Sequence, residues 1–243
     1  MISTDAPFSR FNVDFVNPST LCRYATLPST WQDILVFHSS LATDDYVRQV
    51  DSFYRNAMAT FGEAWWHLDI VNVLFAAAKL HKPKNYLEIG VRRGRSSLVV
   101  ANACPDVNIF GCDIWMENYA GMENPGPDYV RGELIRQGHR GEIEFLNGDS
   151  HILIPDLFRS QPDIQFDLIT VDGDHSEDGA LADLTTVIER LAPGGVLVFD
   201  DIAHPLHPYL LDVWRRATTG HPNLLTYEYT ETGYGIAFAV NQI

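Results

Sequence analysis

The chain has 243 residues, of which 46% are hydrophobic and 20% charged, and its formal net charge is −15 at pH 7. This composition is typical of a folded globular protein and argues against disorder. The 17 Lys and Arg residues form no long run, so the acidic chain would repel phosphate backbones, and we expect no nucleic-acid partner. Three cysteines without a CxxC pair exclude a disulfide framework and a thiolate metal site, which fits a reducing, cytoplasmic location.

The termini and apolar runs indicate no membrane association. The first 15 residues carry Asp and Arg instead of a basic segment followed by an apolar one. The longest apolar run, residues 73–78, is far too short to cross a bilayer. We therefore expect a cytoplasmic protein without a membrane partner.

Residues 1–83 are predicted to form an N-terminal extension. Its beginning contains Pro, Ser and Thr and is interpreted as irregular, and helical patterns follow near 43–59 and 64–80. Trp65 and Trp66 are interpreted as anchors of the second helix, with a pocket wall as the alternative. The extension is also a candidate surface for contacts between identical subunits, and the oligomeric state stays open.

Residues 84–243 are predicted to form one α/β domain. Short β-branched or aromatic runs alternate with helix-length amphipathic segments, which favours a doubly wound, mostly parallel sheet. A short Gly-containing connection near the C-terminus favours an antiparallel hairpin. The predicted strands are 85–89, 108–113, 142–146, 166–171, 195–200, 224–229 and 234–240, and the predicted helices are 96–102, 129–137, 151–158, 177–191 and 205–218.

The first strand leads into a glycine-containing turn, LEIGVRRGRSS, followed by a helix. Gly90 and Gly94 let the backbone approach a ligand, while Ser96 and the free amides at the helix start offer donors to a carboxylate. Glu88 would repel a pyrophosphate and could accept hydrogen bonds from an ammonium group. Because the spacing is not GxGxxG, an amino-acid-bearing cofactor is favoured over a dinucleotide. Asp113 ends the second strand, where a carboxylate can bind ribose hydroxyls.

This order of motifs resembles the class I S-adenosylmethionine methyltransferases, which have a Rossmann-like fold. The resemblance implies S-adenosylmethionine as the cofactor, with Glu88 and the glycine turn at the amino-acid end and Asp113 at the ribose. It also implies that Asp149, after the third strand, faces the adenine amino group. The alternative for Asp149 is a simple helix cap.

Carboxylates cluster at the ends of the fourth and fifth strands, in VDGDH and PGGVLVFDD. Neighbouring parallel strands end at the same sheet edge, so Asp172, Asp200 and Asp201 should meet there. Three close carboxylates need a compensating cation, and an oxygen-only set suits Mg²⁺ or Ca²⁺. The sequence therefore predicts a divalent-metal site beside the cofactor. Asp172 is expected to contact the cofactor as well as the metal.

VDGDH and FDD resemble the metal-dependent O-methyltransferases of the catechol type, and more closely the bacterial macrolide-sugar type. The resemblance covers roughly residues 80–243 and implies Mg²⁺-assisted methylation of a hydroxyl on a small molecule such as a sugar, polyketide or phenol. It also implies that His175 is the general base. An imidazole can accept a proton near neutral pH, and a metal lowers the pKa of a bound hydroxyl.

Several of these residues have simpler interpretations. Asp201 and His175 could only cap helices, and Asp174 could replace one metal ligand. His204 and His207 are separated by prolines and are assigned to the substrate pocket or the surface rather than to a metal. The segment 115–127 is interpreted as a lid beside the cofactor, with a surface excursion as the alternative.

Two other functions stay open. One is a metal-independent O- or N-methyltransferase with the same fold, which would tolerate loss of Asp200 or Asp201. The other is a non-catalytic S-adenosylmethionine-binding module whose first 83 residues contact a partner protein. The intact VDGDH and FDD motifs argue against the second, because binding alone does not require them.

Overall fold

A seven-stranded sheet forms the centre of the molecule. The computed structural model describes residues 16–242, and the strands lie in the order β3-β2-β1-β4-β5-β7-β6. The first five strands are parallel, and β7 runs antiparallel to both β5 and β6. The strands are β1 Asn85–Ile89, β2 Asn108–Asp113, β3 Ile143–Asn147, β4 Phe166–Val171, β5 Leu191–Asp200, β6 Leu224–Tyr229 and β7 Ile236–Asn241. The mostly parallel, doubly wound sheet with a C-terminal hairpin is confirmed.

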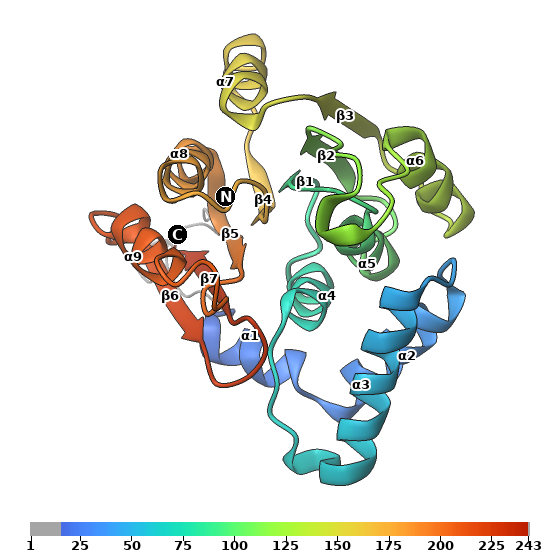
Figure 1. Cartoon of the computed structure of the whole chain (residues 1–243). Helices are drawn as coiled ribbons and strands as arrows, with labels where there is room; N and C mark the ends of the chain where they lie inside the picture. The colour runs from blue at the N-terminus through green and yellow to red at the C-terminus, as the bar shows by residue number, and fades with distance from the viewer. Residues whose placement is uncertain (1–15, 243) are drawn as a thin grey trace, which may run out of the picture.

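Helices cover both faces of this sheet (Figure 1). Side chains of α4, α5 and α6 belong to the hydrophobic cluster on one face, and those of α7, α8 and α9 belong to the cluster on the other. The helices are α1 Pro18–Ala25, α2 Pro28–Ser40, α3 Asp45–Phe61, α4 Ile70–His81, α5 Arg95–Ala103, α6 Pro127–Arg136, α7 Ser150–Ser160, α8 Glu177–Ile188 and α9 Leu210–Thr218, with short 3-10 turns η1 Gly62–Ala64 and η2 Tyr119–Gly121.

The N-terminal extension is helical from its first described turn. The expectation of an irregular start is wrong for residues 18–40, which form α1 and α2. Pro18 and Pro28 stand at the beginnings of these helices, where a missing N–H leaves no helical hydrogen bond unmade. Part of the predicted irregular segment, residues 1–15, lies outside the described residues. The helices α1 and α2 pack on α4, so the extension adds a layer to one face of the sheet domain.

Most strands coincide with buried, apolar segments of the chain. The parallel strands β1, β2 and β4 are buried on both sides, and their sequences are accordingly almost continuous apolar runs. β5 begins at Leu191, four residues before the predicted start, because Leu191 pairs with Phe166 ahead of an irregularity in the ladder. The helix after β5 begins at Leu210 instead of 205, since Pro205 and Pro208 interrupt the intervening turns.

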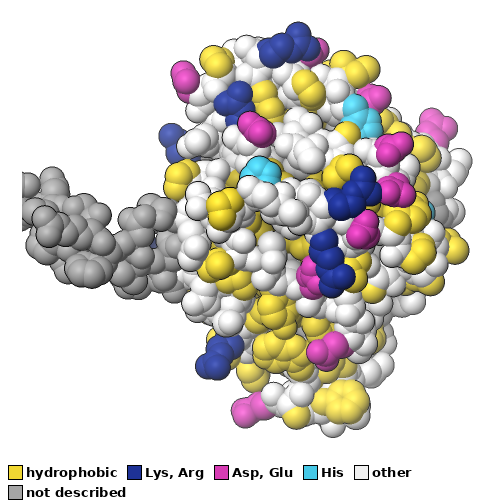
Figure 2. All heavy atoms as spheres, turned by 90° about the vertical axis from the view of Figure 1, so that its left-hand side faces the viewer, with side chains coloured by type: hydrophobic (Ala, Val, Ile, Leu, Met, Phe, Trp, Pro, Cys, Tyr) yellow, Lys and Arg dark blue, Asp and Glu magenta, His cyan; other side chains and the backbone are white. Residues whose placement is uncertain are grey.

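The surface is mixed in charge. On the face shown in Figure 2, the Lys and Arg side chains of the described residues are scattered among acidic and apolar ones. No helix in the described part of the chain is long and apolar enough to cross a membrane.

Candidate functional site

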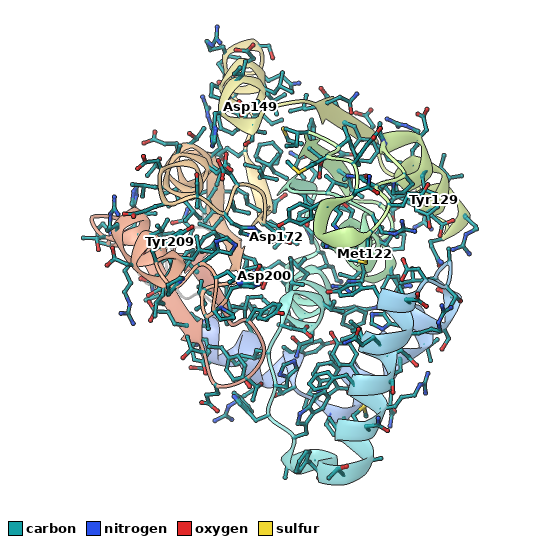
Figure 3. All side chains as sticks on the ribbon, viewed as in Figure 1. Met122, Tyr129, Asp149, Asp172, Asp200 and Tyr209 are labelled. Atoms are coloured by element: carbon teal, nitrogen blue, oxygen red, sulfur yellow. The ribbon has the colours of Figure 1, made fainter. Side chains whose placement is uncertain are left out.

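A cavity of about 1020 Å³ opens at the carboxyl ends of the parallel strands. It lies where the strand order reverses, between β1 and β4, which is where doubly wound folds bind ligands. Gly90, Asp113, Asp172 and Asp200 line it from four different strand ends. Figure 3 shows Asp172 and Asp200 near the middle of the molecule, with Tyr209 on one side and Met122 on the other. The volume is at the upper end of the usual range for a pocket, so two small molecules can share it.

The turn after β1 requires its two glycines for packing as well as for access. Gly90 has a φ of 93°, and a Cβ there would lie 2.0 Å from the backbone oxygen of Asp172. Gly94 has a φ of 73°, and its Cβ would lie 2.3 Å from the side chain of Val130 in α6. Gly90 lines the cavity, whereas Gly94 holds α5 against α6 and does not. Gly94 therefore has a helix-packing role, and its predicted approach to the cofactor stays a prediction.

Glu88 also has a different position from the predicted one. Its side chain is fully buried beneath the turn, does not line the cavity, and accepts hydrogen bonds from the hydroxyls of Ser96 and Ser97. Burial raises the pKa of Glu88 to about 8, although the two serine hydroxyls oppose this shift. Glu88 thus fixes the first turn of α5 from below, while Ser96 reaches the cavity.

Two carboxylates at the ends of β2 and β3 line the cavity as the sequence predicts. Asp113 accepts hydrogen bonds from the backbone N–H groups of Arg92, at 2.7 Å, and Trp115. Asp149 accepts one from the backbone N–H of His151 at 2.9 Å and caps α7. Asp149 therefore caps a helix, as the simpler interpretation predicted. Its side chain also lines the cavity, where a ligand can reach it.

The ends of β4 and β5 bring Asp172, His175 and Asp201 together. One ligand atom from each lies within 4.8 Å of the others. The His175 Nε2 atom is 3.3 Å from Asp172 Oδ1 and 3.6 Å from Asp201 Oδ2. Asp201 has a φ of 64°, a left-handed conformation that turns the chain sharply after β5. The sequence-predicted meeting of Asp172 and Asp201 is what the structure shows, with His175 between them.

Asp200 stands beside this cluster rather than in it. It ends β5 and lines the cavity, but it is not among the three residues whose ligand atoms converge. Burial, followed by repulsion from Asp172 and Asp201, raises the pKa of Asp200 well above its ordinary value. The same two causes, burial first and Asp172 second, raise the pKa of Asp201 to about 7. A cation, whether a proton or a metal ion, would therefore be stabilised among these carboxylates.

His175 is held by aromatic side chains that the motifs did not reveal. The hydroxyl of Tyr119 lies 3.3 Å from His175 Nδ1, and the hydroxyl of Tyr209 donates to the His175 backbone oxygen at 2.8 Å. The His207 ring stacks on the His175 ring at 5.2 Å between centroids. Only the position of Tyr119 in a long aromatic-containing loop indicated such a contact in advance.

The loop between β2 and α6, residues 114–126, contains all but the last residue of the predicted lid 115–127, and several of its side chains line the cavity. Arg92 of the glycine turn places its guanidinium 5.1 Å from the Tyr119 ring and reaches the Tyr119 backbone oxygen at 3.4 Å. Met116 and Met122 also line the cavity. These contacts favour the lid interpretation of the segment over a surface excursion.

Trp65 and Trp66 do not line the cavity. Trp65 packs on Trp31 of α2 at 4.5 Å between ring centroids and stacks on His67 at 5.3 Å. Trp66 is 42% exposed. The anchoring interpretation therefore agrees with the contacts of Trp65.

His204 and His207 both line the cavity. Of their two predicted assignments, substrate pocket or surface, this position agrees with the first.

Comparison with known proteins agrees with this geometry. Residues 87–202, which run from within β1 to just after β5, match a family model described as a methyltransferase domain. The match identifies this segment as a methyltransferase domain, and the sheet that carries it has a Rossmann-like fold. No curated protein matches the chain.

Three solved structures illustrate the likeness. The O-methyltransferase TomG from Streptomyces achromogenes, involved in tomaymycin synthesis and solved with S-adenosylmethionine, is 21% identical, with 88% of this chain and 98% of TomG covered at a TM-score of 0.57. An O-methyltransferase from Bacillus cereus is 18% identical, with 89% and 100% covered at 0.57. The TDP-rhamnose 3'-O-methyltransferase CalS11 is 17% identical, with 87% and 93% covered at 0.56. At these identities the likeness establishes the fold.

Proposed function

We propose that this methyltransferase transfers the methyl group to a hydroxyl of a small molecule, with Mg²⁺ held at the ends of β4 and β5 and His175 as the base. The observation that carries the proposal is the convergence of Asp172, Asp201 and His175 within 4.8 Å, inside the cavity that the glycine turn also lines. The O-methyltransferase names of TomG, the Bacillus cereus enzyme and CalS11 support the choice of oxygen as the acceptor atom.

The cofactor end of the cavity has the residues that S-adenosylmethionine needs. Ser96 and the first amides of α5 suit its carboxylate, Asp113 suits the ribose hydroxyls, and Asp149 suits the adenine amino group. When bound, the cofactor supplies an electrophilic methyl group on its sulfonium. Gly90 keeps this end of the cavity close to Asp172, so the methyl donor and the acceptor share one space.

The carboxylates fit a hard divalent cation. Asp172 and Asp201 offer oxygen ligands, and Asp200 is placed to offer another from the end of β5. Among residues 16–242, Asp172 and Asp201 pair with His175, and no Lys or Arg forms an ion pair with any of the three. Mg²⁺ would neutralise the cluster and lower the pKa of an acceptor hydroxyl bound to it.

His175 would accept the proton of the acceptor hydroxyl. Its ring is partly buried, is fixed by the backbone bond to Tyr209 and the stack with His207, and lies beside the carboxylates where the acceptor oxygen must be. Oxygen gains the methyl group as its proton passes to His175, and S-adenosylhomocysteine leaves. General-base catalysis of this kind contributes about 10²–10⁴-fold to a rate.

The test compares two substitutions of one kind. Asp201→Asn keeps the size of a converging side chain, and Asn tolerates the left-handed backbone at this position. Asp174→Asn changes another cavity carboxylate that is not among the three converging residues. Mn²⁺ serves as the probe of metal affinity, measured by calorimetry, beside methyl transfer to a panel of phenols and sugars.

We expect Asp201→Asn to weaken Mn²⁺ binding and methyl transfer by at least about 10- to 100-fold, which is the effect of disturbing even the partners of metal ligands. S-adenosylmethionine affinity should be unchanged in both variants. Asp174→Asn should resemble the unaltered protein in Mn²⁺ binding. Full methyl transfer by Asp201→Asn would contradict the metal site and favour metal-independent transfer.

A further inference from the structure

Four aromatic rings form a row from His175 to the exposed side chain of Tyr234. Successive centroids are 5.2 Å apart from His175 to His207, 5.0 Å from His207 to His204, and 4.2 Å from His204 to Tyr234. All four residues line the cavity, and Tyr234 is 57% exposed at the outer end. One wall of the acceptor end of the cavity is therefore aromatic along its length.

Two chain segments are held together to build this wall. The backbone N–H of Ala203 donates to the Tyr234 backbone oxygen at 2.6 Å. Gly235, with a φ of 76°, lets the hairpin turn between β6 and β7 approach the loop after β5, because a Cβ there would lie 2.8 Å from Ala203 Cβ. The position of Tyr234 beside His204 is thus set by the backbone and does not depend on a ligand.

The Nδ1 atoms of His204 and His207 are both engaged by neighbouring groups of the protein. The Leu206 backbone N–H donates to His204 Nδ1 at 3.1 Å, and His207 Nδ1 lies 3.1 Å from the Tyr209 hydroxyl. That hydroxyl donates in turn to the His175 backbone oxygen. The wall therefore offers a ligand the faces of its rings, with Nε2 of the two histidines and the Tyr234 hydroxyl as its remaining polar atoms.

The lid segment forms the opposite side. Met116, Tyr119 and Met122 line the same cavity, and Figure 3 shows Met122 across from Tyr209 with Asp172 and Asp200 between them. Thioethers and aromatic rings pack favourably on the face or edge of another aromatic ring. The space above the carboxylates therefore has aromatic rings on one side, and thioethers and the Tyr119 ring on the other.

We propose that this space is a slot for a flat aromatic ring and that the acceptor is a phenol, with Tyr234, His204 and His207 as its stacking wall. The hydroxyl points inward to the carboxylates and His175, and the ring lies between the wall and the lid. This proposal rests on the proposed function for the fate of the hydroxyl, but ring binding is independent of methyl transfer.

The test uses two probes that carry the same pair of adjacent oxygens. Catechol is flat and aromatic, whereas cis-1,2-cyclohexanediol is neither, and the hydroxyls of catechol are also more acidic. Binding to the full chain with S-adenosylhomocysteine is therefore measured by calorimetry both with and without Mg²⁺, so that a preference due to the metal is separated from one due to the ring. The methylation of each probe is followed with S-adenosylmethionine. We expect catechol to bind at least about tenfold more tightly than the diol.

A pair of variants locates the effect. Tyr234→Leu removes the outermost ring at an exposed turn position and should weaken catechol binding about three- to tenfold, the range expected for one aromatic contact. It should leave binding of the diol unchanged. Leu206→Ala changes a residue that is 76% exposed, close in the same loop, and outside the cavity lining, and it should change neither affinity.

Equal or tighter binding of the diol, binding of neither probe, or no effect of Tyr234→Leu on catechol would overturn the aromatic slot. Preferential binding of catechol without its methylation would leave the slot supported and would count against the proposed function. Methylation of the diol in preference to catechol would support O-methylation and refute the phenol.

Discussion

The Nε2 atom of His175 lies 3.3 Å from Oδ1 of Asp172, three residues earlier in the chain. The tight turn after β4 makes this contact, because Asp172 closes the strand and His175 returns to the same sheet edge before α8 begins. The imidazole is thereby fixed beside the carboxylates instead of capping the next helix, where Ser176 supplies the cap. A base in this position can act only on an oxygen held at the carboxylates.

Replacement of this imidazole should slow the chemical step. We expect His175→Ala to lower kcat about 10²- to 10⁴-fold while the affinity for S-adenosylmethionine stays the same. The Mg²⁺ concentration that gives half-maximal activity should also stay the same, since the role of His175 is to take the proton. His221→Ala, at an exposed position, is the control. Recovery of kcat at high Mg²⁺ would show instead that His175 is a metal ligand.

Gly90 is expected to be irreplaceable even by alanine. Gly90→Ala places a Cβ 2.0 Å from the Asp172 backbone oxygen, so β1 and β4 must separate at the cavity. The left-handed backbone alone costs roughly 1–2 kcal/mol, and the clash adds to it. Chemical denaturation and S-adenosylmethionine binding should both show a loss.

Gly138→Ala isolates the backbone contribution, because Gly138 has a φ of 84° and open space around it. It should lose stability without losing cofactor affinity. If both substitutions weakened S-adenosylmethionine binding equally, cofactor binding would not depend on the close approach of the backbones at Gly90 and Asp172.

Glu88 should make stability fall as the pH rises. Its pKa is about 8 in the folded protein against an ordinary value of 4.5, so between these values the folded chain holds a proton that the unfolded chain has released. The free energy of unfolding should drop by roughly 2–3 kcal/mol between about pH 5 and pH 7 from this group alone. Urea unfolding of the ligand-free protein measures it.

Glu88→Gln keeps the size and an acceptor for the serine hydroxyls but cannot ionise. Its free energy of unfolding should not show the decrease with pH that Glu88 causes. The variant should therefore become more stable relative to the unaltered protein as the pH rises. Parallel pH dependences would show that Glu88 is ionised in the folded protein.

The strand ends were predictable because buried parallel strands are apolar runs that stop at polar residues. The bounds of β1, β2 and β4 agree residue for residue with the prediction, and Gly90, Asp113 and Asp172 at the ends of these strands line the cavity. The helices α1 and α2 were missed because proline usually interrupts a helix, whereas Pro18 and Pro28 begin one.

The environment of the site was less predictable than its motifs. Nothing in the sequence around Glu88 indicates that two serines at the start of α5, Ser96 and Ser97, donate hydrogen bonds to its two oxygens. Tyr234 is distant in sequence from the carboxylates and reaches the cavity because β7 is inserted between β5 and β6. Such contacts depend on tertiary packing, which periodicity and spacing do not encode.

Removal and return of the metal would show whether methyl transfer depends on a divalent cation at the carboxylates. The protein is treated with a chelator, and methyl transfer from labelled S-adenosylmethionine to catechol and to a sugar panel is measured before and after addition of Mg²⁺, with cofactor binding followed in parallel. The account predicts that chelation abolishes transfer, that Mg²⁺ restores it, and that S-adenosylmethionine still binds throughout, because Ser96, Asp113 and Asp149 lie apart from the converging carboxylates. Undiminished methyl transfer in the presence of the chelator would contradict it.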